Sequence, residues 1–292
     1  MLTFKKPEIE DLAWIAPMVR QSGLMGCEYA PATLLIWQEK YHTFVGQSSG
    51  FYVAKGKNHF GFPAGESQDL TPVLKDMLAY AKREGFPLRI FGVTPQGKEQ
   101  LEAAWPGKFC YTPLRGDWDY IYSSDDLANL PGKKYHGKRN HISKFERLYS
   151  YTYEDITPQN REECRAAAER WCRNNGCAGD YSEELTAIGY ALDHFEDLGL
   201  KGGMIKVEGN IAGFTIGEEI NDQLFDLHFE KAFPEYNGAY AMINREFARR
   251  NLLCYKYINR EEDLGLEGLR KAKLSYHPAI LLEKYMAEYT GD

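Results

Sequence analysis

The sequence predicts a mixed α/β protein built from two units of related layout. The chain has 292 residues, which is enough for two domains at about 100 to 200 residues each. Segments with helical periodicity and segments with strand composition alternate in both halves. No run rich in Pro, Gly or Ser separates the halves, so we expect two closely packed domains over residues 1–135 and 136–292.

The first half predicts alternating helices and strands. Apolar residues recur at helical spacing in 9–20, 71–84 and 98–105. Aromatic and β-branched residues, which are typical of strands, concentrate in 50–54, 88–93 and 118–122. The resulting order alternates from residue 9 to residue 122, as in an α/β layout.

The second half shows the same mixture. Helical periodicity is present in 137–149, 160–174, 182–197, 239–251, 265–274 and 278–288. Strand composition is present in 204–207, 211–216, 223–229 and 255–258. The dipeptide Gly209-Asn210 stands between two apolar runs and therefore predicts a β-hairpin.

Composition and charge exclude several classes of protein. The net charge of −7 belongs wholly to residues 136–292, which argues against a surface that coats nucleic acid or anionic membrane. The apolar runs are far shorter than the roughly 20 residues of a membrane helix. Acidic residues occupy the place where a signal peptide needs its apolar stretch. Six cysteines without CxxC spacing fit a reducing compartment, so we expect a cytoplasmic protein.

Residues 133–147 form the densest basic segment of this acidic chain. If the segment is helical, its cations and the free backbone N–H groups at the helix start suit a phosphate. Lys138, Arg139 and Asn140 lie in this segment, and Tyr135 beside them offers a ring that stacks on a base. We therefore expect an anion site here, with a solvated helix face as the alternative.

Residues 228–244 run from a predicted strand through a loop into a predicted helix. Asn237 and Gly238 stand at the junction, where small residues let a ligand approach the N–H groups of the helix start. The alternative is an ordinary strand-to-helix turn that uses Asn-Gly.

Residues 257–276 crowd polar side chains after a predicted strand, where α/β sheets place their sites. Glu261 or Asp263 is a candidate base, and Arg270 and Lys273 are candidate contacts for an anion or a carbonyl group. Tyr276 is a candidate proton donor, because neighbouring cations lower the pKa of a phenol. The alternative is a structural knot of ion pairs.

Taken in order, several motifs resemble the phosphatidylglycerol lysyltransferase C-terminal (LPG synthase C-type) family, in its small soluble branch. These motifs are Asp117-Trp118-Asp119-Tyr120-Ile121-Tyr122, Lys138-Arg139-Asn140-His141, Ala212-Gly213-Phe214-Thr215-Ile216-Gly217, His228-Phe229-Glu230-Lys231-Ala232, Gly238-Ala239-Tyr240, Asn259-Arg260-Glu261-Glu262-Asp263-Leu264-Gly265 and Gly268-Leu269-Arg270-Lys271-Ala272-Lys273. The resemblance extends from about Asp117 to the C-terminus.

The resemblance implies two tandem folds of the acetyltransferase (GNAT) type, with mostly antiparallel mixed sheets flanked by helices, as in Fem-type aminoacyltransferases. GNAT folds bind the acyl donor's phosphates with a Q/R-x-x-G-x-G/A loop. Residues 235–240 occupy this place but lack the opening Arg or Gln and carry Tyr240 at the final small position. This departure disfavours acyl-CoA, and relatives that use aminoacyl-tRNA tolerate such a loop. The resemblance therefore implies a local contact of the basic segment 133–147 with tRNA.

These observations predict an acyltransferase without a metal or a tightly bound cofactor, which moves an aminoacyl group from aminoacyl-tRNA to an amine or hydroxyl of a small-molecule, peptide or lipid acceptor. Glu230 or Glu261 is the expected base. The candidate catalytic residues are Glu230, Glu261 and Tyr276. The candidate substrate-binding residues are Lys138, Arg139, Asn140, Lys231, Asn237, Gly238, Asn259, Arg260, Asp263, Arg270 and Lys273. The alternatives are an acyl-CoA-dependent N-acetyltransferase and a non-catalytic GNAT-like binding module.

Overall fold

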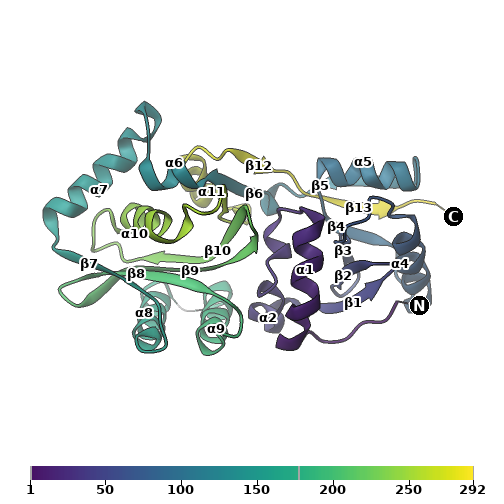
Figure 1. Cartoon of the computed structure of the whole chain (residues 1–292), viewed down its shortest axis with the longest axis horizontal. Coiled ribbons are helices and arrows are strands. Elements are labelled where there is room, and N and C mark those ends of the chain that lie inside the picture. Colours follow the sequence, from purple (N-terminus) through teal and green to yellow (C-terminus); the bar gives the residue numbers. More distant parts are fainter. Residues whose placement is uncertain (1, 177, 292) are drawn as a thin grey trace. The chain divides into compact units, whose positions relative to one another are not determined.

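The computed structural model describes residues 2–176 and 178–291 (Figure 1). The chain divides into two compact units. Unit 1 consists of Met1–Asp119, Glu261–Arg270 and Leu281–Asp292, and unit 2 consists of Tyr120–Arg260 and Lys271–Ile280. The C-terminal part of the chain therefore contributes to both units. No helix in the described ranges is long and apolar enough to cross a membrane.

Unit 1 is built around a six-stranded sheet with the strand order β1-β2-β3-β4-β13-β5. Its strands are β1 (Phe44–Ser48), β2 (Phe51–Lys55), β3 (Phe60–Gly61), β4 (Arg89–Val93), β5 (Phe109–Pro113) and β13 (Tyr285–Tyr289). Its helices are η1 (Ile9–Asp11), α1 (Leu12–Ser22), η2 (Cys27–Tyr29), α2 (Thr33–Ile36), α3 (Gln38–Tyr41), α4 (Thr71–Glu84), α5 (Pro95–Ala104) and η3 (Arg115–Asp117). Helix α11 (Glu267–Leu274) begins in unit 1 and ends in unit 2.

The core of unit 1 explains why its elements form. Helix α4 has the bounds that its periodicity predicts, and it buries Val73, Leu74, Met77 and Ala81 in one apolar cluster with residues of β2 and β4. The spacing of three and four residues places these side chains on one helix face.

The prediction of a helix over 278–288 is wrong, because this segment forms β12 (Ile280–Leu282) and β13. Strand β13 is antiparallel to both β4 and β5 and lies between them. Tyr285, Ala287 and Tyr289 recur at strand spacing and pack in the core of unit 1. Pairing with two distant strands, rather than local periodicity, decides the structure of this segment.

Unit 2 is built around a seven-stranded sheet with the order β12-β6-β11-β10-β9-β8-β7. Its remaining strands are β6 (Asp119–Ser123), β7 (Tyr151–Asp155), β8 (Lys201–Val207), β9 (Asn210–Asn221), β10 (Leu224–Ala232) and β11 (Tyr257–Asn259). Its helices are α6 (Ser124–Asn129), η4 (Lys133–Tyr135), α7 (His136–Leu148), α8 (Arg161–Asn174), α9 (Asp180–Asp193), α10 (Ala239–Phe247) and the π-helix η5 (Ala248–Leu252).

Helices cover both faces of this sheet. Helix α10 packs on β8, β9 and β10 next to α6 and α7, while α8 and α9 lie on the opposite face (Figure 1). The predicted hairpin is confirmed between β8 and β9, where Val207 pairs with Asn210. Its turn residues are Glu208 and Gly209, both with positive φ (50° and 79°), one position earlier than the sequence suggested.

The parallel pair β10 and β11 positions the candidate site. Their pairing ends at Asp226 and Asn259, where β11 stops, whereas β10 continues to Ala232 against β9 alone. Glu230 and Arg260 therefore follow the last paired residues of two neighbouring strands. Carboxyl ends of parallel strands are a common place for binding sites in α/β sheets.

Candidate functional site

The three segments that the sequence singled out meet within unit 2. Arg260 Nη2 lies 2.6 Å from Glu230 Oε1. The centroid of the Tyr276 ring lies 4.8 Å from the Arg260 guanidinium carbon and 3.7 Å from Lys138 Nζ. Asn244 of α10 donates from Nδ2 to Glu230 Oε2 over 2.9 Å. We call Lys138, Glu230, Asn244, Arg260 and Tyr276 the Arg260 cluster.

The Arg260 cluster contains two buried polar atoms with no hydrogen-bond partner among the described residues, Arg260 Nη1 and Asn244 Oδ1. The side chains of Arg260 and Glu230 are only 14% and 10% exposed. A carboxylate only accepts hydrogen bonds, so Asn244 must turn Nδ2 toward Glu230 and Oδ1 away from it. An unpaired buried polar group costs about 1–3 kcal/mol, so a ligand or a water molecule that paired with these two atoms would relieve that cost.

Burial changes the proton affinities of the cluster. Burial, followed by the like charge of Arg260, lowers the pKa of Lys138 to about 8, while Glu230 opposes this shift. Lys138 Nζ donates to Ser275 Oγ over 2.7 Å. Contrary to the expectation for Tyr276, burial raises the pKa of its phenol, and the opposing effect of Arg260 is smaller. Tyr276 is therefore a neutral hydrogen-bond donor at physiological pH.

Lys273 and Asn259 support the backbone around the cluster. Lys273 Nζ donates to the carbonyl oxygen of Arg260, and the Tyr122 hydroxyl donates to the carbonyl oxygen of Lys273 over 2.8 Å. Asn259 is fully buried at the end of β11, opposite Asp226. These contacts hold Arg260 at the point where β10 and β11 separate.

Three predicted substrate contacts make other interactions. Arg139 donates to the carbonyl oxygens of Leu130 and Gly132, which ties α7 to the preceding loop. Asn140 Nδ2 lies 3.1 Å from His136 Nε2 on the exposed side of the same helix. Lys231 Nζ lies 2.7 Å from Glu184 Oε1 and 4.2 Å from the centroid of the Trp171 ring.

Helix α7 packs closely against the start of α10. Gly238 precedes α10 with φ +95°, and a Cβ there would lie 2.4 Å from the carbonyl oxygen of His141 in α7. The backbone N–H of Asn237 donates to the hydroxyl of Tyr149 over 3.3 Å, and that hydroxyl donates to the carbonyl oxygen of Glu235 over 3.2 Å. The glycine is therefore required by the turn and by the close approach of α7.

Asp263, in unit 1, has both carboxylate oxygens fully engaged. Oδ2 accepts from Arg115 Nη1 (2.9 Å) and Arg270 Nε (2.8 Å), and Oδ1 accepts from Arg270 Nη2 (3.0 Å) and the Gly265 backbone N–H (2.9 Å). The side chain is completely buried. Glu261, two residues earlier, has a positive φ of 55°. The ion pairs of Asp263 with Arg115 and Arg270 agree with the alternative interpretation of residues 257–276, in which the charged residues form structural ion pairs.

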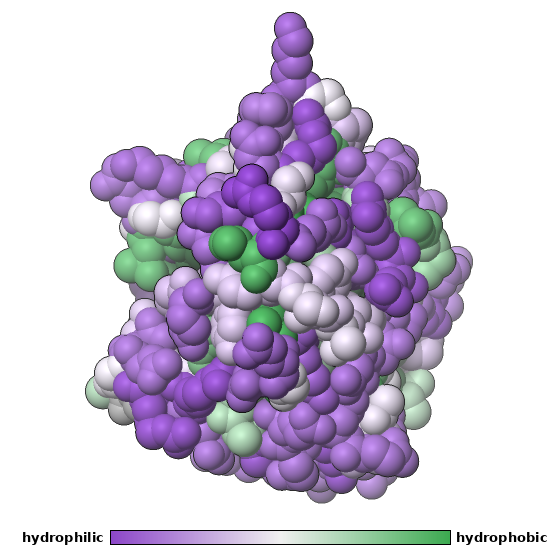
Figure 2. Space-filling model, turned by 90° about the vertical axis from the view of Figure 1, so that its left-hand side faces the viewer, coloured by the Kyte–Doolittle hydropathy of each residue, from purple (hydrophilic) through white to green (hydrophobic). Residues whose placement is uncertain are grey.

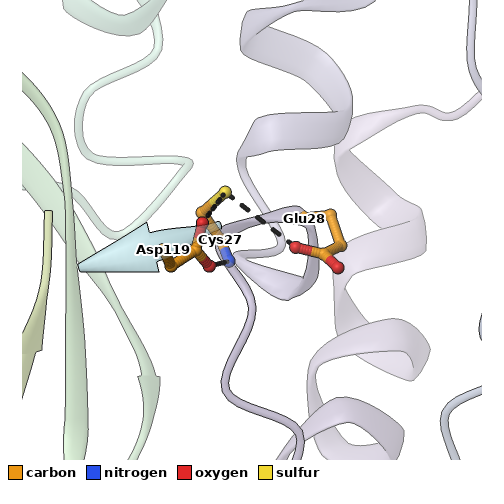
Figure 3. A group of neighbouring side chains, drawn as sticks. All are labelled: Cys27, Glu28 and Asp119. Carbon is orange, nitrogen blue, oxygen red and sulfur yellow. Dashed lines mark hydrogen bonds between the residues drawn. The ribbon is translucent and has the colours of Figure 1, made fainter. Parts of the chain in front are cut away.

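A second buried group of charges in unit 1 was not expected from the sequence (Figure 3). Cys27 Sγ lies 3.4 Å from both Asp119 Oδ1 and Glu262 Oε2. Lys284 Nζ lies 2.8 Å from Asp119 Oδ1 and 2.5 Å from Glu28 Oε2. These five residues come from four distant places in the chain, at positions 27–28, 119, 262 and 284, so no local pattern predicts their meeting.

Burial and neighbouring negative charges raise pKa values in this second group. Burial, followed by the charges of Glu261 and Asp119, raises the pKa of Glu262 to about 7. Burial likewise raises the pKa of the Cys27 thiol well above its usual value. Cys27, Glu28 and Asp119 place ligand-type atoms within 4.8 Å of one another. The Lys284 ammonium already supplies a positive charge to two of these residues, so a metal ion would compete with it.

His228 is buried between two carboxylates of unit 2. Its Nε2 lies 3.0 Å from Glu218 Oε1, and its Nδ1 lies 3.2 Å from Asp226 Oδ2.

The architecture defines the class of the protein as a tandem GNAT fold. FemX shares it over 98% of this chain and 95% of that chain, with 10% identity and a TM-score of 0.58. A tandem GNAT protein from the clavulanic acid biosynthesis pathway shares it over the full length of both chains, with 12% identity and a TM-score of 0.50. The predicted fold class is therefore confirmed.

Within this class, residues 20–288 match the family "Phosphatidylglycerol lysyltransferase, C-terminal", and the chain belongs to this family. A conserved protein of unknown function from Bacteroides thetaiotaomicron is 41% identical, with a TM-score of 0.95 over 99% of this chain and 100% of that chain. L-PGS from Bacillus licheniformis is 16% identical, with a TM-score of 0.70 over 99% and 94%. An uncharacterised protein from Mycoplasmoides gallisepticum is 22% identical over 174 residues, which are 58% of this chain and only 56% of that protein.

Proposed function

We propose that this protein is an aminoacyltransferase that moves an aminoacyl group from aminoacyl-tRNA to an amine or hydroxyl acceptor. The observation that supports this proposal most strongly is the Arg260 cluster, where a buried arginine keeps the donor Nη1 without a hydrogen-bond partner among the described residues. Such transfer requires positioning, a base for the attacking group and a donor for the developing oxyanion.

The Arg260 cluster provides groups for each of these requirements. Arg260 Nη1 donates to the carbonyl oxygen of the acyl group, where negative charge develops. Glu230 binds both Arg260 and Asn244 and so fixes the direction of the guanidinium. Lys138, with its pKa lowered to about 8, is partly neutral near physiological pH and accepts the proton of the attacking group. The neutral phenol of Tyr276 donates to the leaving ester oxygen.

The start of α10 favours aminoacyl-tRNA over acyl-CoA as the donor. Acyl-CoA-dependent GNAT folds bind the donor's phosphates at this helix start, with N–H groups that must be accessible. Here α7 contacts Gly238, and Tyr149 accepts the N–H of Asn237. These contacts are a second argument against acyl-CoA as the donor, in addition to the missing Arg or Gln of the loop pattern.

The exposed side of α7 offers cations to a nucleic acid. Lys144 and Arg147 are exposed on this helix. Lys134 is paired with Asp126 at 3.0 Å. Figure 2 shows that the face of unit 2 that carries α7 is mainly hydrophilic, with only small and scattered apolar groups. A local contact with tRNA phosphates fits such a surface better than an apolar partner does.

Transfer of radiolabelled amino acids from a panel of charged tRNAs tests the proposal, with small amines, peptides and phosphatidylglycerol vesicles as acceptors. We expect transfer to at least one acceptor from at least one tRNA, above spontaneous hydrolysis. Lys138→Met should lower the rate about 100-fold or more, as removal of a general base does. The control Lys82→Met removes an exposed lysine of α4, outside the basic segment 133–147, and should retain the rate. Transfer from acetyl-CoA and from no tRNA would refute the proposal.

A further inference from the structure

We propose that Ser275 is a positioning residue whose hydroxyl fixes the direction in which Lys138 accepts a proton. This inference rests on the proposed function, in which Lys138 takes the proton of the attacking group. It adds a residue that acts through Lys138 rather than on the substrate.

The hydroxyl of Ser275 can only accept a hydrogen bond from Lys138. Its Oγ lies 2.5 Å from the carbonyl oxygen of Ala272, three residues earlier, and donates to it. A serine hydroxyl has one proton, and this contact uses it. Lys138 Nζ, which lies 2.7 Å from the same Oγ, is therefore the donor in the second contact. Lys138 gives one N–H to Ser275 whether the amine is protonated or neutral.

Backbone hydrogen bonds hold Ser275 in place on both sides. Its N–H donates to the carbonyl oxygen of Lys271 over 3.0 Å, at the end of α11. The carbonyl oxygen of the next residue, Tyr276, accepts from the hydroxyl of the buried Tyr135 over 2.9 Å. Ser275 therefore offers an acceptor of fixed position to Lys138 of α7.

The ring of Tyr276 directs a second N–H of Lys138. Lys138 Nζ lies 3.7 Å from the centroid of this ring. The face of an aromatic ring carries negative charge, so it attracts an N–H and repels a lone pair. A neutral amine has two N–H groups and one lone pair. Because Ser275 and the ring each take one N–H, the lone pair points away from both, and a general base needs such a fixed direction.

The same contact affects the charge of Lys138. The ionisable side chains that face its amine are Arg260, Glu230 and Tyr276. Burial and Arg260 lower the pKa of Lys138 to about 8, against the effect of Glu230. An acceptor stabilises an ammonium more than a neutral amine, because a charged donor makes the stronger hydrogen bond. Removal of the Ser275 hydroxyl should therefore lower the pKa of Lys138 further.

Titration of Lys138 in the free, full-length protein tests the contact without a substrate. With isotope-labelled lysine followed by NMR, we expect the midpoint of Lys138 to fall by about half a pH unit or more in Ser275→Ala. Ser275→Thr keeps the hydroxyl and should restore the midpoint. Ser275 is exposed, so both variants should fold. An unchanged midpoint in Ser275→Ala would overturn the inference.

Ser22→Ala is the matched control. The hydroxyl of Ser22 donates to the carbonyl oxygen of Val19, three residues earlier at the end of α1, over 2.7 Å. Its oxygen accepts from the backbone N–H of Leu24 rather than from a lysine. This variant loses the same kind of hydroxyl-to-carbonyl contact in unit 1, and it should leave the midpoint of Lys138 unchanged.

The pH dependence of transfer shows whether the contact acts on proton transfer. The rate should rise with pH through the pKa of Lys138, because the base must be neutral. In Ser275→Ala we expect a plateau about 10-fold lower, from the lost orientation, and a rise that moves to lower pH. Ser275→Thr should stay within 3-fold of the wild type. A structural defect alone would lower the plateau without moving the rise, and that result would overturn the inference.

The two experiments separate this inference from the proposed function. If the wild type transfers amino acids and Ser275→Ala matches it in plateau and pH dependence, the function stands and the role of Ser275 is wrong. If the midpoint falls in Ser275→Ala but no tRNA serves as a donor for the wild type, Ser275 positions Lys138 and the proposed function is wrong.

Discussion

Arg260 and Arg270 lie in the same stretch of sequence, residues 259–276, and each pairs with a buried carboxylate. The two groups differ in how many of their polar atoms have a hydrogen-bond partner. In unit 1, each oxygen of Asp263 accepts two hydrogen bonds, from Arg115, Arg270 and Gly265. In unit 2, Glu230 accepts one from Arg260 and one from Asn244. Each of these two partners keeps one buried polar atom that has no hydrogen-bond partner in the described parts of the chain.

This difference separates a structural ion pair from a candidate binding site. A buried carboxylate with all its acceptor positions filled has little left to offer a ligand, and its partners hold the loop in place. A buried pair with open atoms has an unfavourable free energy until something binds. We therefore propose that the Asp263 group stabilises unit 1 and that the Arg260 cluster forms the functional site.

The largest effect on stability should come from the Asp263 group. Asp263→Ala removes a fully buried carboxylate and leaves Arg115 and Arg270 without their shared partner. We expect the free energy of unfolding to fall by about 3–5 kcal/mol, measured by urea denaturation. The control Glu99→Ala changes an exposed residue of α5 and should stay within about 0.5 kcal/mol of the wild type. A similarly small effect of Asp263→Ala would contradict the structural assignment.

A smaller effect is expected where α7 meets α10. Gly238→Ala introduces a side chain at φ +95° and a Cβ 2.4 Å from the His141 carbonyl oxygen, so we expect a loss of about 2 kcal/mol or more. In Gly137→Ala, also in unit 2, the new Cβ meets nothing within 4 Å inside a helix, and a gain of up to about 1 kcal/mol should follow. Thermal unfolding of both variants measures the difference, and equal midpoints would show that α7 does not hold the start of α10.

The smallest effect is the contribution of Lys138 to the dependence of stability on pH. The pKa of Lys138 is about 8 in the folded protein, below its ordinary value of 10.5. Between these two values the unfolded chain binds more protons than the folded chain, so stability rises with pH. The free energy of unfolding of the wild type, relative to Lys138→Met, should therefore increase from pH 8 to pH 10.5 and be constant below pH 8. A relative decrease over that range would contradict the lowered pKa.

Local patterns predicted much of the fold. Helix α4 was predicted because its apolar periodicity matches the face that it buries. Strands β8, β9 and β10 were predicted from runs rich in aromatic and β-branched residues, and the sheet buries most of these residues. Strand β13 was not, because its structure depends on pairing with β4 and β5, about 175 to 195 residues earlier in the chain. The group of Cys27, Asp119 and Lys284 was missed for the same reason, since its members lie far apart in the sequence.

The sequence predicted which segments contribute to the candidate site, but not which of their side chains contact one another. The sequence brought together the segments of Lys138, Glu230 and Arg260, and the structure places these side chains in one cluster. Residue types alone do not reveal which of several arginines has its donors filled, so Arg260 and Arg270 were equivalent candidates. Asn244 was missed because a lone asparagine on a helix has no distinguishing pattern.

The most direct test compares Arg260→Met with Arg270→Met in the transfer of an amino acid from the charged tRNA that the wild type uses best, with rates expressed per folded molecule. We predict that Arg260→Met loses about 100-fold or more, as expected when a donor to the developing oxyanion is removed. Arg270→Met should transfer within 3-fold of the wild type and be less stable. Equal losses in the two variants, or a larger loss in Arg270→Met, would contradict the proposal that the Arg260 cluster serves function and the Asp263 group serves stability.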